Sequence, residues 1–218
     1  MRKIFKSFML VAVAAMAFTS CQKEETAAPE TVSATLTMHA GVEETKTYLG
    51  EDNAVLWGKG EAVTLYVGSG ETAKFFDSTS TDDYDGEASA SFTFEIKDVT
   101  AADSYALGGI YPASAAIDEV ALSATQNQVD GNYDPSAYIM VLKPGVVTEL
   151  PTDYTASFRR AVALNKITLT GVKEDISSVE ITVPEEKYLA GRRYMNLTTG
   201  ESGEVYYDQS NKVTVNSS

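Results

Sequence analysis

The chain has 218 residues, 44% of them hydrophobic, which is enough for one large or two small domains with an ordinary core. It carries 31 acidic residues against 17 basic ones, and a surface of this charge repels the phosphate backbone of nucleic acids. The single histidine, His39, removes most histidine-based catalysis and most zinc sites from consideration.

The first twenty residues have the pattern of an export signal. Three basic residues precede an apolar run over residues 9–18. This run is shorter than the roughly 18 apolar residues that a membrane-spanning helix needs, so residues 1–20 are predicted to be a signal peptide. The segment AFTSC resembles the bacterial lipobox, with Phe18 where Leu, Val or Ile is usual. The resemblance implies that Cys21 begins the mature protein and carries lipid.

The mature protein would be strongly acidic and without disulfides. Removal of the signal peptide leaves 14 basic and 31 acidic residues, a net charge of −17. Because Cys21 is the only cysteine, stability depends on the core alone. This charge gives no attraction to anionic lipid, so attachment to the membrane would rest on the acyl chains.

Residues 21–32 are polar, contain Pro29, and are predicted to form a flexible tether. Lys23, Glu24 and Glu25 resemble the surface-export signal of Bacteroidetes lipoproteins, which implies an outward-facing position on the cell outer membrane. An ordinary solvated linker is the alternative explanation of these three charges.

From residue 33 onward apolar and polar residues alternate with a period of two, which is typical of half-buried strands. Predicted strands cover residues 34–40, 63–67, 92–96, 105–110, 138–142, 158–169 and 179–183, followed by a pair at 205–207 and 213–215. Clusters of turn-forming residues separate them, and no segment has a long helical pattern. The predicted fold is therefore all-β, a β-sandwich with Greek-key-like connections.

Two details of this pattern are less regular. Within residues 158–169 the apolar positions change parity, which predicts a β-bulge near Asn165 or Lys166. Arg159 is predicted to face outward, and Arg160 to point inward at the end of the sheet, where it can reach solvent. Residues 33–171 are predicted to form an N-terminal β-sandwich domain. Residues 172–218 contain too few strands to close a sandwich, so they are either its last strands or the start of a second, incomplete β domain.

Five segments, in this order, resemble the fimbrillin-like lipoproteins of Bacteroidetes, which are subunits and accessory components of type V pili. They lie at residues 43–68, 105–112, 123–145, 158–171 and 179–200. The resemblance implies a transthyretin-like sandwich that assembles with other pilus subunits by donor-strand exchange. Taken singly, Trp57, Tyr66 and Tyr111 are predicted core or rim residues, and Gly108, Gly109 and Gly191 are predicted at turns or bulges.

The same resemblance implies proteolytic processing at Lys46. In the family, a trypsin-like protease cuts the loop after the first strand, and loss of that strand leaves a groove for a donor strand. Lys46 is the basic residue of the corresponding loop here, whereas the best-known pilins have Arg, so a Lys-accepting protease is required. The alternative is an ordinary solvated loop lysine.

No catalytic residue, cofactor or metal site is predicted. His39 lacks a second histidine or a free cysteine with which to form a triad, and it is predicted to face solvent from a strand. The acidic run over residues 82–87 lacks the full ladder of a calcium loop and is predicted to be a hairpin turn, with calcium binding as the alternative. An enzyme would need paired carboxylates in a cleft, whose spacing only the fold sets.

The predicted function is that of a non-enzymatic surface lipoprotein in adhesion or pilus assembly. Its predicted partners are the outer membrane through lipid, other pilus subunits, and ligands on host or bacterial surfaces. The alternative is a monomeric surface lipoprotein that binds glycans through exposed aromatic residues on a rigid sandwich, or binds host proteins.

Overall fold

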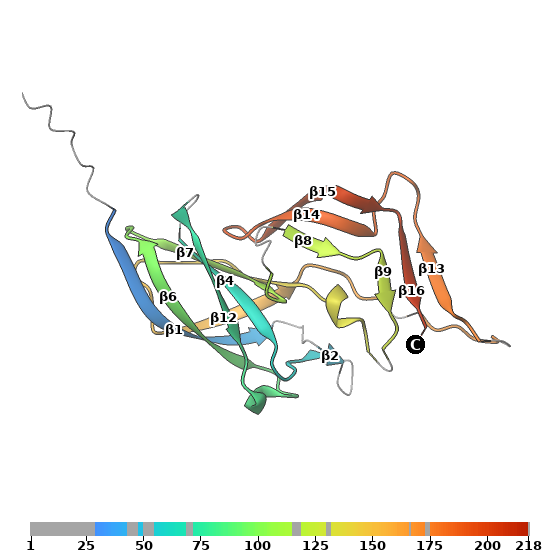
Figure 1. The fold of residues 1–218 in the computed structure, drawn as a ribbon, viewed down its shortest axis with the longest axis horizontal. Helices are drawn as coiled ribbons and strands as arrows, with labels where there is room; N and C mark the ends of the chain where they lie inside the picture. The colour runs from blue at the N-terminus through green and yellow to red at the C-terminus, as the bar shows by residue number, and fades with distance from the viewer. Residues whose placement is uncertain are drawn as a thin grey trace, which may run out of the picture.

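The computed structural model describes residues 29–42, 48–49, 55–68, 72–114, 119–129, 132–165, 167–172 and 175–217. Within these ranges the chain is almost entirely strand and turn, with the short 3-10 helices η3 (Asp82–Tyr84) and η4 (Pro135–Ala137) between strands. The prediction of an all-β fold is confirmed, and the sheets pack as a sandwich that approaches a barrel (Figure 1).

The largest sheet contains eight strands in the order β5-β4-β7-β10-β12-β1-β6, with β11 also paired to β7. Their bounds are β1 (Thr31–Val42), β4 (Ala62–Gly68), β5 (Lys74–Thr79), β6 (Ala90–Thr100), β7 (Tyr105–Tyr111), β10 (Met140–Leu142), β11 (Gly145–Val147) and β12 (Asp153–Arg160). β1 runs parallel to β12, whereas the other pairs described in this sheet are antiparallel. The outer strands β5 and β6 contact each other, so the sheet curls and nearly closes.

The interior of the curled sheet holds the larger hydrophobic core, centred on Trp57. This side chain is fully buried, and its ring meets those of Phe92, Tyr111 and Phe158 edge to face at centroid distances of 5.1, 5.6 and 5.9 Å. Each such pair contributes about 0.5–1.5 kcal/mol beyond the burial of its area. Trp57, predicted to be a core or rim residue, is thus the central side chain of this core.

A second core lies on the outer face of the same sheet. Tyr66, Ile110 and Val141 project from β4, β7 and β10 and share a buried cluster with Val120 and Met195. The last two residues belong to β8 (Glu119–Leu122) and β14 (Ala190–Asn196), which form a three-stranded sheet with β15 (Glu201–Ser210). β4 is consequently buried on both faces, although its sequence alternates like a half-exposed strand.

Gly108 lets the two sheets approach closely, and Gly109 lets β7 lie close to its neighbour β4. A Cβ atom on Gly108 would collide with the backbone oxygen of Leu197, and one on Gly109 would lie 2.8 Å from the backbone oxygen of Thr64. Both glycines lie inside β7, so the prediction of turns or bulges there is wrong. Gly191 has a φ of +129° where the register of β14 against β15 shifts, which confirms the predicted irregularity at that position.

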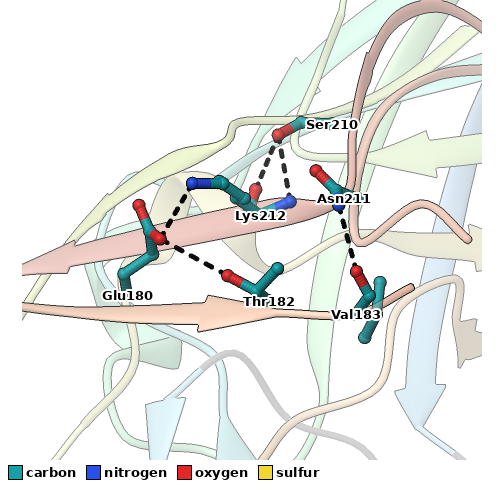
Figure 2. A network of polar contacts seen from close by, with 6 residues as sticks. All are labelled: Glu180, Thr182, Val183, Ser210, Asn211 and Lys212. Atoms are coloured by element: carbon teal, nitrogen blue, oxygen red, sulfur yellow. Dashed lines mark hydrogen bonds and ion pairs between the residues drawn. The ribbon is translucent and has the colours of Figure 1, made fainter. Parts of the chain in front are cut away.

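The last two strands do not pair with each other, so the predicted pairing of residues 205–207 with 213–215 is wrong. β15 pairs with β14, whereas β16 (Lys212–Asn216) pairs with β13 (Ser178–Thr182) and β9 (Thr125–Asn127). The chain changes sheets at Asn211, whose side-chain amide donates to the Val183 carbonyl at 3.0 Å (Figure 2). Beside it, Lys212 forms an exposed ion pair with Glu180 at 3.0 Å.

The strand predicted at residues 158–169 ends at Arg160. Its neighbour β10 begins at Met140, which lies opposite Arg160, so among the described residues no strand pairs with the segment that follows. The apolar residues at positions 167 and 169 are about half exposed. The predicted bulge near Asn165 is therefore wrong, and Lys166 lies outside the described residues. Arg160 lies opposite the buried Met140 and is exposed at the end of β12, which agrees with its predicted inward parity at a point where it reaches solvent.

The smaller sheets combine strands from distant parts of the chain. β8 and β9 lie between β7 and β10 in sequence, yet their partners are β14 and β16. A further short pair joins β2 (Tyr48–Leu49) to β3 (Val55–Leu56). The predicted division of the chain at residue 171 stays a prediction.

Candidate functional site

β1 occupies a slot between β12 and β6 in the main sheet (Figure 1). Residues 37–42 of β1 lie opposite residues 153–158 in the parallel pair, and residues 31–40 lie opposite residues 90–100 in the antiparallel pair. Both edges of β1 are therefore paired through the backbone along much of its length.

Three side chains of β1 enter the main core. Leu36, Met38 and Ala40 are each fully buried, as the alternation in the sequence predicts. On β6 the residues opposite Leu36 and Met38 are Phe94 and Phe92. Burial of a Leu or Met side chain is worth about 1.5–3 kcal/mol relative to exposure. Loss of β1 without replacement would expose this part of the core and leave unpaired edges on β6 and β12.

The other face of β1 is polar. His39 is exposed, as predicted, with its Nδ1 2.9 Å from the Ser91 hydroxyl and its Nε2 3.5 Å from Asp153. The Thr35 hydroxyl donates to the Glu95 carboxylate at 3.1 Å. Exposed contacts of this kind contribute about 0–1 kcal/mol each. The buried side chains and the two backbone ladders therefore hold β1 in place.

The residues predicted for lipid attachment, surface export and proteolytic cleavage flank β1 in sequence. Cys21, Lys23, Glu24 and Glu25 precede the strand, and Lys46 follows it. All five lie outside the residues that the structure describes. Lipid attachment, the surface-export signal and processing at Lys46 therefore stay predictions.

A second group of side chains lies on the face of the β8-β14-β15 sheet opposite the second core, and the sequence pattern did not predict it. Tyr194, Tyr206 and Tyr207 are 53%, 38% and 59% exposed. The rings of Tyr194 and Tyr206 stack in parallel with their centroids 4.2 Å apart. The Arg192 guanidinium lies 5.7 Å from the centroid of the Tyr207 ring, within range of a cation–π contact.

Carboxylates from the two outer strands complete this group. Glu119 accepts hydrogen bonds from the Tyr206 hydroxyl and, at 3.5 Å, from Arg192, which also donates to Asp208 at 3.2 Å. The hydrogen bonds to Glu119 are the main reason that the pKa values of Tyr206 and Arg192 are raised, since they favour the protonated forms. We name the set the tyrosine face: Glu119, Arg192, Tyr194, Tyr206, Tyr207 and Asp208.

A β-bulge places two adjacent tyrosines on the tyrosine face. Arg192 lies opposite Tyr207 and Arg193 lies opposite Val205, so β15 has an extra residue, Tyr206, at this point. Adjacent side chains in a regular strand point to opposite faces of the sheet. At a bulge, two residues lie opposite one residue of the partner strand, so adjacent side chains can share a face. No residue type at positions 205–207 is typical of a bulge, so the two rings could not be assigned to one face from the sequence.

The acidic run at residues 82–87 begins with η3 and continues as a turn. Among the described residues, no three His, Cys, Asp or Glu side chains gather closely enough to hold a metal ion. Over the same part of the chain, no helix has the length and apolar character needed to cross a membrane.

Comparison with known proteins gives one weak structural likeness. No protein-family model matches the sequence, and no curated protein matches it. Among solved structures, the fold is similar to a fimbrial assembly protein from Parabacteroides distasonis, with a TM-score of 0.30 and 8% identity over 86% of this chain and 78% of that chain. At these values the likeness carries neither fold nor function from that protein to this one.

Proposed function

We propose that the chain is a lipid-anchored protein of the bacterial outer surface, that it serves as a pilus subunit or accessory component, and that β1 is exchanged for a donor strand on assembly. The observation that carries this proposal is the position of β1, a separate N-terminal strand inserted between β6 and β12 with its apolar face in the core. The predicted signal peptide, the segment that resembles a lipobox and the five segments that resemble fimbrillin-like proteins support it.

A donor strand would have to reproduce two features of β1. The first is an extended backbone that offers N–H and C=O groups to β6 and β12 at the same time. The second is a row of apolar side chains at alternate positions, to replace Leu36, Met38 and Ala40. An extended segment of another subunit with this alternation meets both requirements.

Proteolysis at Lys46 would make the exchange possible. While the loop after β1 is intact, the strand is present at an effective concentration that a separate chain cannot easily match, on the order of millimolar. A cut in this loop leaves β1 held only by its backbone pairs and buried side chains. A donor strand that fits the slot at least as well can then replace it.

The experiment combines limited trypsin digestion with strand replacement, using the full-length folded protein in detergent. Apart from Lys23 in the predicted tether, we expect the first cut after Lys46, ahead of Arg159, Arg160, Arg192 and Arg193, because these arginines lie in paired strands. The cut after residue 46 should be absent in Lys46→Ala. Mass spectrometry identifies the cut. First cleavage at those arginines, with Lys46 intact, would contradict processing.

The cut protein is then incubated with a fluorescent peptide of residues 29–42. We expect the peptide to enter the cut wild-type protein and to stay out of uncut Lys46→Ala. A matched peptide with Leu36→Asp and Met38→Asp should fail to enter, since it would place carboxylates in the core. If the unaltered peptide does not enter the cut protein, or the altered one enters equally, β1 is not an exchangeable strand.

A further inference from the structure

We infer that the tyrosine face binds a neutral carbohydrate chain. The site is independent of strand exchange, because β1 takes no part in the β8-β14-β15 sheet. Its ligand class follows from three properties of the face: exposed aromatic rings on a fixed support, polar groups already ordered for hydrogen bonding, and a charge that disfavours anionic ligands.

The first property is the exposure of three tyrosine rings on a sheet that is fixed from behind. Met195 and Val120 anchor the opposite face of this sheet in the second core. Tyr194 and Tyr206 stack on each other and remain 53% and 38% exposed, so part of each ring is open to a ligand. The apolar C–H face of a sugar ring packs on such a surface, and tyrosine combines an apolar body with a polar hydroxyl.

The second property is a set of polar groups held in place before any ligand arrives. Arg192 bonds to Glu119 and Asp208, which restricts all three side chains. The side chains of Arg192 and Asp208 are still 44% and 58% exposed. A carboxylate can accept about four hydrogen bonds and a guanidinium can donate five, so the group retains capacity for sugar hydroxyls. Restricting these side chains in advance lowers the entropic cost of binding.

The third property is charge. Nucleic-acid bases also stack on tyrosine, but the tyrosine face has two carboxylates against one guanidinium, and the chain has a formal charge of −14. Phosphate backbones and acidic polysaccharides are repelled by this balance. A chain of uncharged hexoses or pentoses offers the same stacking surface together with hydroxyl groups and without the repulsion.

The test is affinity electrophoresis of full-length Lys46→Ala protein in detergent, so that strand exchange plays no part. The gels contain dextran, mannan, xylan or hydroxyethyl cellulose, and parallel gels contain alginate. We expect retardation by at least one neutral polymer and none by alginate. Retardation by alginate alone, or by none of the four neutral polymers, would overturn the inference and leave the strand-exchange proposal untouched.

Variants connect the binding to the tyrosine face. Tyr194→Ala and Tyr207→Ala should each weaken binding by about tenfold, the effect of losing one ring contact. Tyr194→Phe keeps the ring and should retain most of the affinity. Tyr188→Ala is the matched control, since Tyr188 is 42% exposed but lies outside the tyrosine face. Unchanged binding by Tyr194→Ala and Tyr207→Ala, or an equal loss in Tyr188→Ala, would overturn the assignment.

Discussion

Asp134 is a buried carboxylate that joins a small sheet to the segment leading into the main sheet. It accepts hydrogen bonds from the Ser136 amide at 2.9 Å, the Ser136 hydroxyl at 2.7 Å and the Asn127 amide at 2.8 Å. Burial on its own would raise the pKa of Asp134, but these hydrogen bonds favour the ionised form and lower the pKa below its ordinary value of 3.8. Since Asn127 ends β9 and Ser136 lies in η4, one side chain ties both elements together.

The lowered pKa gives a pH-dependent stability. Asp134 stabilises the fold above its unfolded-state pKa, and this contribution is lost as the pH falls through the lower folded-state pKa. Asp134→Ala should therefore lower the free energy of unfolding by about 1–3 kcal/mol at pH 7 and by less near pH 2. Urea unfolding at both pH values measures the difference. Ser136→Ala removes one of the donors and should show a smaller loss with the same trend; a pH-independent loss in Asp134→Ala would refute this role.

Which residues of a strand face the core could be predicted; which strands become neighbours could not. The alternation around Leu36 and Met38 is a local pattern, and it correctly predicts which face of β1 is buried. Nearness in sequence instead favoured a β15–β16 hairpin, which is wrong because Asn211 directs the chain into another sheet. The tyrosine face was also beyond prediction, since a bulge and strands from two parts of the chain create it.

The corner at Asn211 contains two polar contacts that should contribute unequally to the free energy of unfolding (Figure 2). Asn211→Ala removes a partly buried hydrogen bond to a backbone carbonyl and should cost about 1 kcal/mol. Lys212→Ala removes an ion pair whose side chains are 53% and 51% exposed, and should cost about 0–0.5 kcal/mol. Thermal unfolding of the two variants under the same conditions compares them. A larger loss in Lys212→Ala would mean that the ion pair, and not the amide, holds the corner.

For the whole molecule, the predicted lipid anchor joins the fold through the short segment between Cys21 and β1. Radiolabelled palmitate should enter the wild-type protein in cells and not Cys21→Ser, because the thiol would be the point of attachment. Protease added to intact cells should remove the wild-type protein. The combined change of Lys23, Glu24 and Glu25 to Ala should protect it, if these residues direct export to the outer face.

The predictions of lipid attachment and of surface export can be refuted independently. Equal palmitate labelling of Cys21→Ser would exclude that cysteine as the lipid site. Removal of the triple variant at the wild-type rate would show that the three charges belong to an ordinary linker. Neither result would alter the position of β1 between β6 and β12.

The interleaving of early and late strands has a consequence for how the chain folds. β8 and β9 leave the ribosome well before β14 and β16, and the Glu119–Tyr206 hydrogen bond spans 87 residues of sequence. Such long separations raise the contact order and slow folding. Until the later strands pair with them, β8 and β9 have open edges that are prone to aggregation. Partly folded chains that lack the pairing of β14 and β16 are therefore vulnerable to aggregation.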